Sequence, residues 1–203
     1  MRYVKILGLA AIAAGALMAF VGAGTASADV LCTTNTTNEC ASGWRVTHIV
    51  ASQVGTGVLK TTGGTTLDTC SGASVESEDT EGSETHEPGG AITSLTWSGC
   101  SATTTTINNG KLTIRTKETA GGVHDNTVVA DNTRVTIQLF GITCVYGSGE
   151  EKSLGDLTVG QDPILHINVA IPKIEGGGLC PASGQWEATF TVTNHNAIWL
   201  SKK

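Results

Sequence analysis

Apolar and polar residues alternate one for one along several stretches of the chain, as they do in strands that bury a single face. The clearest stretch is 186–192, where Trp186, Ala188, Phe190 and Val192 alternate with polar residues. Similar stretches lie at 44–50, 111–117, 134–139 and 164–171. Weaker candidates lie at 57–61, 65–70, 92–97, 103–107, 127–130 and 154–159. No amphipathic helix follows residue 28, so the pattern predicts an all-β protein.

Turns rich in glycine and asparagine separate these predicted strands. The pair Asn109-Gly110 lies between the stretches 103–107 and 111–117 and predicts a β-hairpin there. Short strands that follow one another at this spacing favour an antiparallel β-sandwich, with a closed β-barrel as the alternative.

The first 28 residues have a different pattern. Two basic residues, Arg2 and Lys5, precede an apolar run over 6–21, and the segment ends in Ala26-Ser27-Ala28. This order is typical of a secretory signal peptide with its cleavage site. A membrane anchor is the alternative, but the apolar run is shorter than the roughly 20 residues of a spanning helix. We therefore expect a signal-peptide helix over 1–28 and one secreted β domain over 29–203.

The charge of the chain narrows the possible partners. Residues 29–203 contain 10 basic and 18 acidic residues, a formal net charge of −8. Nucleic acids bind through Lys and Arg contacts to phosphates, so we expect no nucleic-acid partner. No apolar stretch after Ala28 is long enough to span a bilayer as a helix, so we expect no membrane span after cleavage.

All six cysteines follow the predicted cleavage site, and an even number in an exported chain indicates disulfides. Six cysteines allow many pairings, and the spacing does not choose among them. Our hypothesis is sequential pairing, because a short interval suits a loop and the two longer intervals suit links between strands. The predicted pairs are Cys32–Cys40, Cys70–Cys100 and Cys144–Cys180. Zinc-site spacing such as C-x₂-C is absent from the sequence.

One segment, 74–90, is acidic and nearly free of apolar residues, which predicts an exposed loop. Its weak candidate ligands for a cation such as Ca²⁺ are Glu78, Asp79, Glu81 and Glu84. The segment lacks the residue order of a preformed Ca²⁺ loop, so a solubilising loop is the favoured interpretation and we expect no cofactor.

Catalytic motifs are not evident in the sequence. The five histidines have no paired spacing, and no G-x-S-x-G turn marks a nucleophilic serine. Glycoside hydrolysis needs two acids. The available carboxylates are Asp125, Asp131, Glu150, Glu151, Asp156 and Glu187. No pair among them stands out, so we expect a protein that is not an enzyme.

Tryptophan is the largest apolar side chain in this chain, which is only 4% aromatic. We expect Trp97 and Trp186 in the core, because they fit the alternating apolar face. The stretch that starts at Trp44 would place Val46 and His48 on the same face as that ring. Trp199 is the candidate for a binding surface, since exposed tryptophans often contact sugars or protein partners.

Several motifs resemble those of a family of small secreted actinobacterial all-β proteins. The matching segments are 92–100, Cys144-Val145-Tyr146-Gly147, Leu154-Gly155-Asp156-Leu157 and the run 180–186 that begins with Cys180-Pro181. The resemblance covers most of residues 44–200. It implies an extracellular β domain and transfers no catalytic residue.

These observations favour a non-enzymatic binding or interaction module, secreted to the extracellular space or associated with the cell wall. Its expected partner is a protein or a glycan at the cell exterior. One alternative is a secreted hydrolase with dispersed carboxylates. Another is a Ca²⁺-dependent or inhibitory module that acts through the segment 74–90.

Overall fold

A computed structural model of the chain describes residues 29–36, 40–78, 87–118 and 124–202. These residues form strands and a single turn of 3-10 helix at Ser42–Trp44. The strands are β1 (Asp29–Cys32), β2 (His48–Thr61), β3 (Thr66–Glu78), β4 (Gly89–Cys100), β5 (Thr103–Asn108), β6 (Lys111–Glu118), β7 (His124–Asp131), β8 (Arg134–Leu139), β9 (Ile142–Gly147), β10 (Lys152–Thr158), β11 (Gly160–Gln161), β12 (Ile164–Glu175), β13 (Ser183–Val192) and β14 (Ala197–Lys202). The predicted signal peptide over 1–28 lies outside the described residues.

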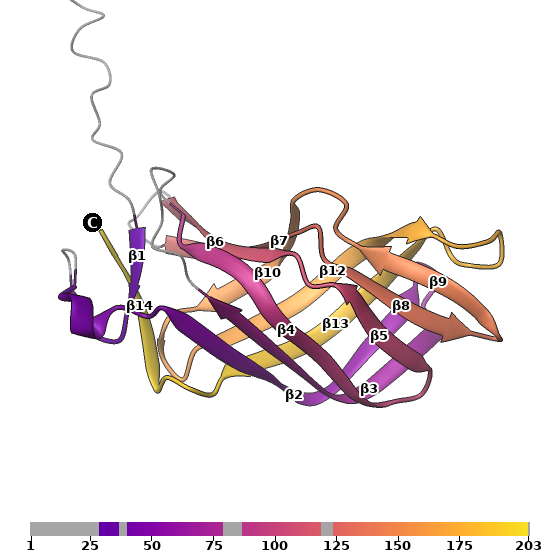
Figure 1. Cartoon of the computed structure of the whole chain (residues 1–203), viewed down its shortest axis with the longest axis horizontal. Helices are drawn as coiled ribbons and strands as arrows, with labels where there is room; N and C mark the ends of the chain where they lie inside the picture. Colours follow the sequence, from indigo (N-terminus) through magenta and orange to yellow (C-terminus); the bar gives the residue numbers. More distant parts are fainter. Residues whose placement is uncertain (1–28, 37–39, 79–86, 119–123, 203) are drawn as a thin grey trace, which may run out of the picture.

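The main sheet is a closed, antiparallel barrel of eight strands (Figure 1). Three of the eight barrel strands are interrupted. Each of these consists of two consecutive segments along the barrel wall, namely β5 and β6, β7 and β8, and β9 and β10. β6 pairs with β7 and β7 with β10, while β5 pairs with β8 and β8 with β9. With each interrupted pair taken as one strand, neighbours in the wall follow one another along the chain. The architecture is therefore an up-and-down barrel.

Two pairings close the sheet on itself. β13 pairs with β2 from Gly184↔Thr61 to Val192↔Ala51, and β10 pairs with β12 from Gly155↔Ile167 to Thr158↔Ile164. A sandwich would instead leave free edges in each of two sheets. The predicted β-sandwich is therefore wrong, and the closed barrel named as its alternative is what the structure contains. The alternation of apolar and polar residues identifies the buried face of each strand. It does not show whether the last strand pairs with the first.

Between β4 and β5 the barrel wall differs from the rest. Side-chain hydrogen bonds bridge much of this seam in place of a regular backbone ladder. The hydroxyl of Thr106 donates to the carbonyl of Leu95 at 2.8 Å, and Trp97 Nε1 donates to that hydroxyl at 3.0 Å. Asn109 Nδ2 donates to the carbonyl of Thr93 at 3.1 Å. These bonds satisfy backbone groups that the missing ladder would leave unpaired.

The predicted hairpin at Asn109-Gly110 is wrong. β5 and β6 do not pair with each other; both run beside β4, and β6 pairs with β4 at Gly89–Ala91. Gly110 has a φ of 69°, and the Thr133 hydroxyl donates to the carbonyl of Asn109 at 2.9 Å. Asn109-Gly110, predicted to form a turn, therefore makes a kink within the long strand formed by β5 and β6.

The predicted stretch 44–50 also differs from the structure. Trp44 belongs to the 3-10 turn and is exposed, and β2 begins at His48. Residues near Trp44 run beside β1, where Thr33 N–H donates to the carbonyl of Trp44 and Val46 N–H to that of Leu31. Pairing with β1 removes this segment from the barrel wall, so the shared face predicted for 44–50 is wrong.

The predicted loop 74–90 is shorter than expected. β3 continues to Glu78 and β4 begins at Gly89, with Val75 opposite Leu95 and Ser77 opposite Ile92. Polar side chains do not prevent pairing here, because only every second residue must face inward. Residues 79–86 lie outside the described part of the chain.

A second sheet, in the order β1-β14-β11, covers one end of the barrel. Figure 1 shows β1 and β14 together at the left end of the molecule. Leu31 of β1 and Ile198 of β14 are among the most completely buried side chains. The disulfide Cys32–Cys40 closes the loop after β1. We call this the plugged end.

The opposite end carries the other two disulfides, and we call it the cross-linked end. Cys70–Cys100 joins directly opposed residues of β3 and β4, and Cys144–Cys180 joins β9 to the segment before β13. All three disulfides have the sequential pairing that we predicted. Within the described ranges, no helix is long and apolar enough to cross a membrane.

Candidate functional site

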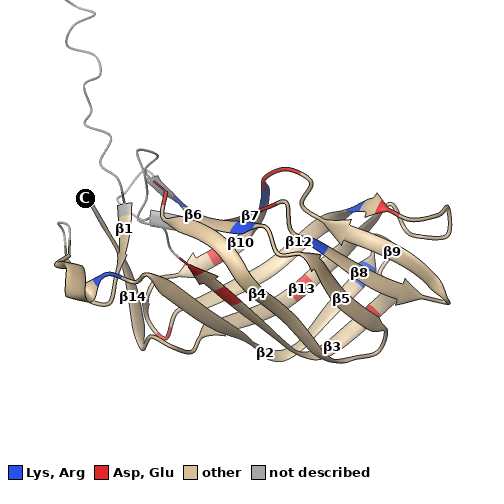
Figure 2. Cartoon of the chain, viewed as in Figure 1, with Lys and Arg blue, Asp and Glu red and all other residues tan. Residues whose placement is uncertain are grey.

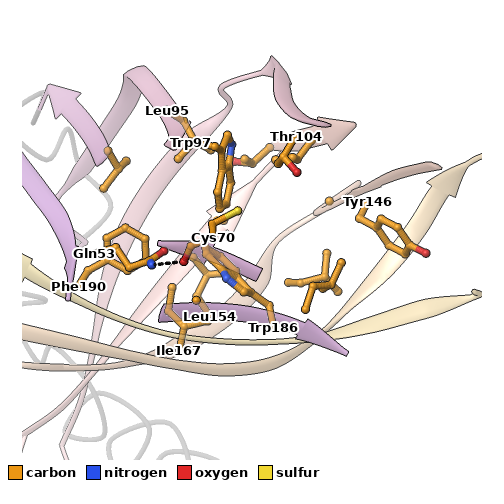
Figure 3. Close-up of a pocket in the computed structure, with 18 of the residues that line it drawn as sticks. Gln53, Cys70, Leu95, Trp97, Thr104, Tyr146, Leu154, Ile167, Trp186 and Phe190 are labelled. Carbon is orange, nitrogen blue, oxygen red and sulfur yellow. Dashed lines mark hydrogen bonds between the residues drawn. The ribbon is translucent and has the colours of Figure 1, made fainter. Parts of the chain in front are cut away.

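The barrel interior contains an apolar cavity of about 120 Å³. Strands from around the barrel contribute to its wall, including Leu59 of β2, Leu154 of β10 and Ile167 of β12. These positions face inward because of the alternation along each strand. Figure 3 shows Trp97 on one side of this space and Leu154 with Ile167 on the other.

Three aromatic rings form part of the cavity wall. The ring centroids of Trp97 and Trp186 lie 5.7 Å apart at an interplanar angle of 56°, and Trp186 meets Phe190 edge to face at 6.1 Å. Trp186 and Phe190 share the inward face of β13, while Trp97 comes from β4. Trp97 and Trp186 are partly buried and pack against the buried core, in agreement with the prediction that they face inward.

Asp68 is a buried carboxylate in the wall, only 3% exposed. Its Oδ1 accepts hydrogen bonds from the N–H groups of Thr69 and Ala102 at 2.8 Å each and from the Ser101 hydroxyl at 2.9 Å. Its Oδ2 accepts from the Thr104 hydroxyl at 2.6 Å. Four donors therefore compensate its burial and attach β3 to the turn between β4 and β5.

The Gln53 side chain replaces backbone hydrogen bonds that a bulge in β2 interrupts. The registers of β2 with β3 and of β2 with β13 both shift near residues 53–57. Gln53 Nε2 donates to the carbonyls of Gly55 and Cys70 at 2.9 Å each, which supplies donors where the ladder is interrupted. Figure 3 shows the bond to Cys70. Gln53 Oε1 is buried and meets no donor among the described residues.

Tyr146 of β9 also lines the cavity and is buried. Its hydroxyl donates to the carbonyl of Pro181 at 3.1 Å, near the disulfide Cys144–Cys180. Burial raises the pKa of the Tyr146 phenol, because the charged phenolate loses its hydration. The hydroxyl therefore acts as a neutral donor that ties β9 to the segment before β13.

A second apolar cavity of about 70 Å³ lies beneath the plugged end. Leu31 and Ile198 of the plug contribute to its wall. Four side chains line both cavities, and these are Val75, Leu112, Leu165 and Phe190. The two cavities are therefore neighbours inside one barrel, separated by this shared set of apolar side chains.

Charged residues are spread along several strands and turns, as Figure 2 shows. Arg115 contacts Glu87 at 3.0 Å and Glu151 at 2.6 Å. The hydrogen bond and charge of Arg115 hold the pKa of Glu151 below its usual value, and the same bonds raise the pKa of Arg115. Exposed pairs of this kind contribute little stability.

Three of the carboxylates considered for hydrolysis, Asp131, Glu151 and Glu187, take part in separate ion pairs. Glu187 pairs with Lys60 at 2.6 Å and Asp131 with Lys111 at 3.4 Å. Of the carboxylates in the described ranges, Asp68 is the one on the wall of the larger cavity, and its oxygens are already hydrogen bonded. None of Asp131, Glu150, Glu151, Asp156 and Glu187, the candidates with described side chains, lies on that wall.

Of the other predicted site residues, Trp199 and Glu78 lie in the described part of the chain, and neither is on the wall of the larger cavity. Trp199 of β14 is half-buried, and its ring lies near Gly160 of β11. Glu78 is exposed at the end of β3 and contributes to the wall of the smaller cavity. The other cation candidates, Asp79, Glu81 and Glu84, lie outside the described residues. Binding at Trp199 and at the acidic segment stays a prediction.

One group of possible metal ligands is explained by the disulfide. Asp68, Cys70 and Cys100 lie close together, but the two sulfurs are bonded to each other and offer no thiolate. The sequence pattern alone did not single out Asp68. Asp68 lies two residues before Cys70 and therefore on the same strand face as a predicted disulfide. This position is the sequence feature that could have indicated a buried carboxylate.

No family model, curated protein or solved structure matches this chain. The resemblance to secreted actinobacterial proteins therefore stays a prediction.

Proposed function

We propose that this protein is an exported, non-enzymatic binding protein that holds one small apolar molecule inside its barrel. The observation that carries the proposal is the apolar cavity of about 120 Å³ among Trp97, Trp186 and Phe190. Eight-stranded barrels have interiors just wide enough for side chains or one small ligand. An engineered cavity of about 150 Å³ in another protein binds benzene, so the available space suits a molecule of that size class.

The surroundings of the cavity resist collapse into it. Asp68 and its four donors fix the turn after β4, and Cys70–Cys100 joins β3 to β4 beside it. Cys144–Cys180 and the bond from Tyr146 to Pro181 fix the neighbouring segment. A wall held in this way retains a preformed space, which lowers the ordering cost of binding.

Export forms part of the proposal. It is supported by the signal-like sequence of residues 1–28 and by three disulfides with no free cysteine in the described residues. Intact mass with thiol alkylation, measured on culture medium and cell-wall fractions, tests it. A chain that begins at Asp29 and carries no label is expected. An uncleaved or alkylated chain would contradict export with three bridges.

Binding is tested with toluene as the probe, by thermal unfolding and by tryptophan fluorescence. At a free concentration tenfold above Kd, the ligand stabilises the fold by about 1.4 kcal/mol. For a chain of this size that raises Tm by about 3–6 °C. The fluorescence should also change, because two tryptophans line the cavity.

Ala130→Leu is the variant that should abolish toluene binding. Ala130 is buried on the cavity wall, so a leucine there occupies the space that the ligand needs. Val135→Leu is a milder variant with the same aim. Thr105→Val on the exposed face of β5 is the matched control and should bind like the wild type. An unchanged Tm and fluorescence of the wild type up to the solubility limit of toluene would overturn the proposal.

A further inference from the structure

The two interior cavities are separated by a partition of four apolar side chains, Val75, Leu112, Leu165 and Phe190. Phe190 has the only aromatic ring among them, and its side chain is 3% exposed. Its edge-to-face contact with Trp186 holds the ring in place on the same strand. Phe190 therefore stands between about 120 Å³ of space on one side and about 70 Å³ on the other.

We infer that the larger cavity selects a compact, uncharged molecule built on a single aromatic ring, and that Phe190 sets the upper limit of its length. This inference rests on the proposed function. A long alkyl chain fits neither cavity by itself, and it could extend from one to the other only by displacing the partition. The limit therefore belongs to one identifiable side chain, together with the three that pack around it.

The aromatic preference follows from the rings in the wall. Trp97, Trp186 and Phe190 already meet one another in tilted and edge-to-face arrangements, and a fourth ring can join such a cluster. A saturated ring of similar size buries comparable apolar area but gains no interaction between ring edges and faces. Toluene is therefore expected to bind about fivefold more tightly than methylcyclohexane.

We expect an uncharged ligand because of the polar groups in the cavity wall. Asp68 is the charged residue among those that line the larger cavity, and its carboxylate oxygens are used by four donors. A ligand cation would compete with those donors, and a ligand anion would lie near the carboxylate. Transfer of an unpaired charge into this apolar space is strongly unfavourable.

The test is a series of alkylbenzenes with increasing tail length, from toluene through n-butylbenzene to n-hexylbenzene. Their Kd values are measured by tryptophan fluorescence on the full chain and on the Phe190→Ala variant. For the wild type, affinity should fall along the series once the tail exceeds the larger cavity. For Phe190→Ala, affinity should continue to rise, by about fourfold for each methylene that enters the joined space.

Ile114→Ala is the matched control. Ile114 is buried and lines the smaller cavity but not the larger one, so this change adds space without opening the partition. It should keep the wild-type length profile. Circular dichroism checks that each variant is folded, and Phe190→Leu replaces Phe190→Ala if the alanine variant does not fold, with a smaller shift in the same direction.

The outcomes separate the two proposals. If no compound binds the wild type or any folded variant, the proposed function fails. If the compounds bind but the length profile is the same with and without Phe190, the partition is wrong and the proposed function stands. Equal affinities of toluene and methylcyclohexane would overturn the aromatic preference alone.

Discussion

The plugged end and the cross-linked end close the same barrel by different means. At the plugged end, Leu31 and Ile198 insert apolar side chains from a separate small sheet. At the cross-linked end, the elements are tied by two disulfides and by hydrogen bonds to Asp68 and from Tyr146. The smaller cavity lies at the plugged end, and the larger one has Asp68, Cys70 and Tyr146 in its wall.

This difference shows how a small protein can keep space inside its core. Apolar side chains that are free to pack tend to fill a void, because interiors are close-packed. Covalent links and saturated hydrogen bonds fix backbone positions independently of packing. The cross-linked end therefore keeps its shape around the larger cavity, whereas the plugged end relies more on buried apolar side chains, with one disulfide in the segment after β1 and a smaller cavity.

The largest effect is expected at the cross-linked end, from Asp68→Ala. Removing the carboxylate leaves the Ala102 N–H without its acceptor, leaves the Thr69 N–H with the Ser101 hydroxyl alone, and removes the acceptor of the Ser101 and Thr104 hydroxyls. We expect the free energy of unfolding to fall by about 4 kcal/mol, measured by urea denaturation. Asp68→Asn is the control and should lose less, because its side-chain oxygen can still accept. Similar, small losses in both variants would show that the disulfide alone holds this end.

The next effect is expected at the plugged end, from Ile198→Ala. Ile198 is fully buried and lines the smaller cavity, so truncation removes apolar contacts and enlarges a void. We expect a loss of about 3 kcal/mol in the same denaturation measurement. Toluene binding should be unchanged, because Ile198 does not contribute to the wall of the larger cavity. Lost toluene binding would show that the two ends are not independent.

The smallest effect is expected from Tyr146→Phe. At neutral pH the variant lacks the bond to Pro181 and should lose about 1 kcal/mol. Because burial raises the pKa of Tyr146 above the unfolded value of about 10, its contribution is complete below pH 10 and is lost as pH rises above it. The stability difference between wild type and variant should therefore shrink above pH 10. A difference that stays constant from pH 8 to pH 11 would contradict this.

The sequence was most informative where the alternation of residues within one strand determines which of its faces is buried. The alternation over 186–192 predicts the inward position of Phe190, and the structure buries that side chain. The sequential disulfides also agree with the structure, because each joins segments that are close along the chain. In both cases the deciding information is local.

The sequence was least informative where distant segments decide the outcome. Asn109-Gly110 has the residues of a hairpin turn, yet β5 and β6 continue along β4 because β8 and β7 pair with their other edges. Closure into a barrel similarly depends on β2 and β13. The cavity could not be predicted, since its volume depends on how side chains from most of the strands fit together. Asp68 offers a partial signal, as an acid on an inward strand face.

The pairing of β2 with β13 has a consequence for how the chain folds. Its partners, such as Thr61 and Gly184, lie more than 120 residues apart, whereas each disulfide joins cysteines at most 36 residues apart. No covalent link crosses this junction, so hairpins and bridges can form while the sheet is still open. An open sheet exposes the edges of β2 and β13 to other chains. Closure of this junction is a long-range step of the kind that slows folding, and until it occurs these two edges are open to pairing with another chain.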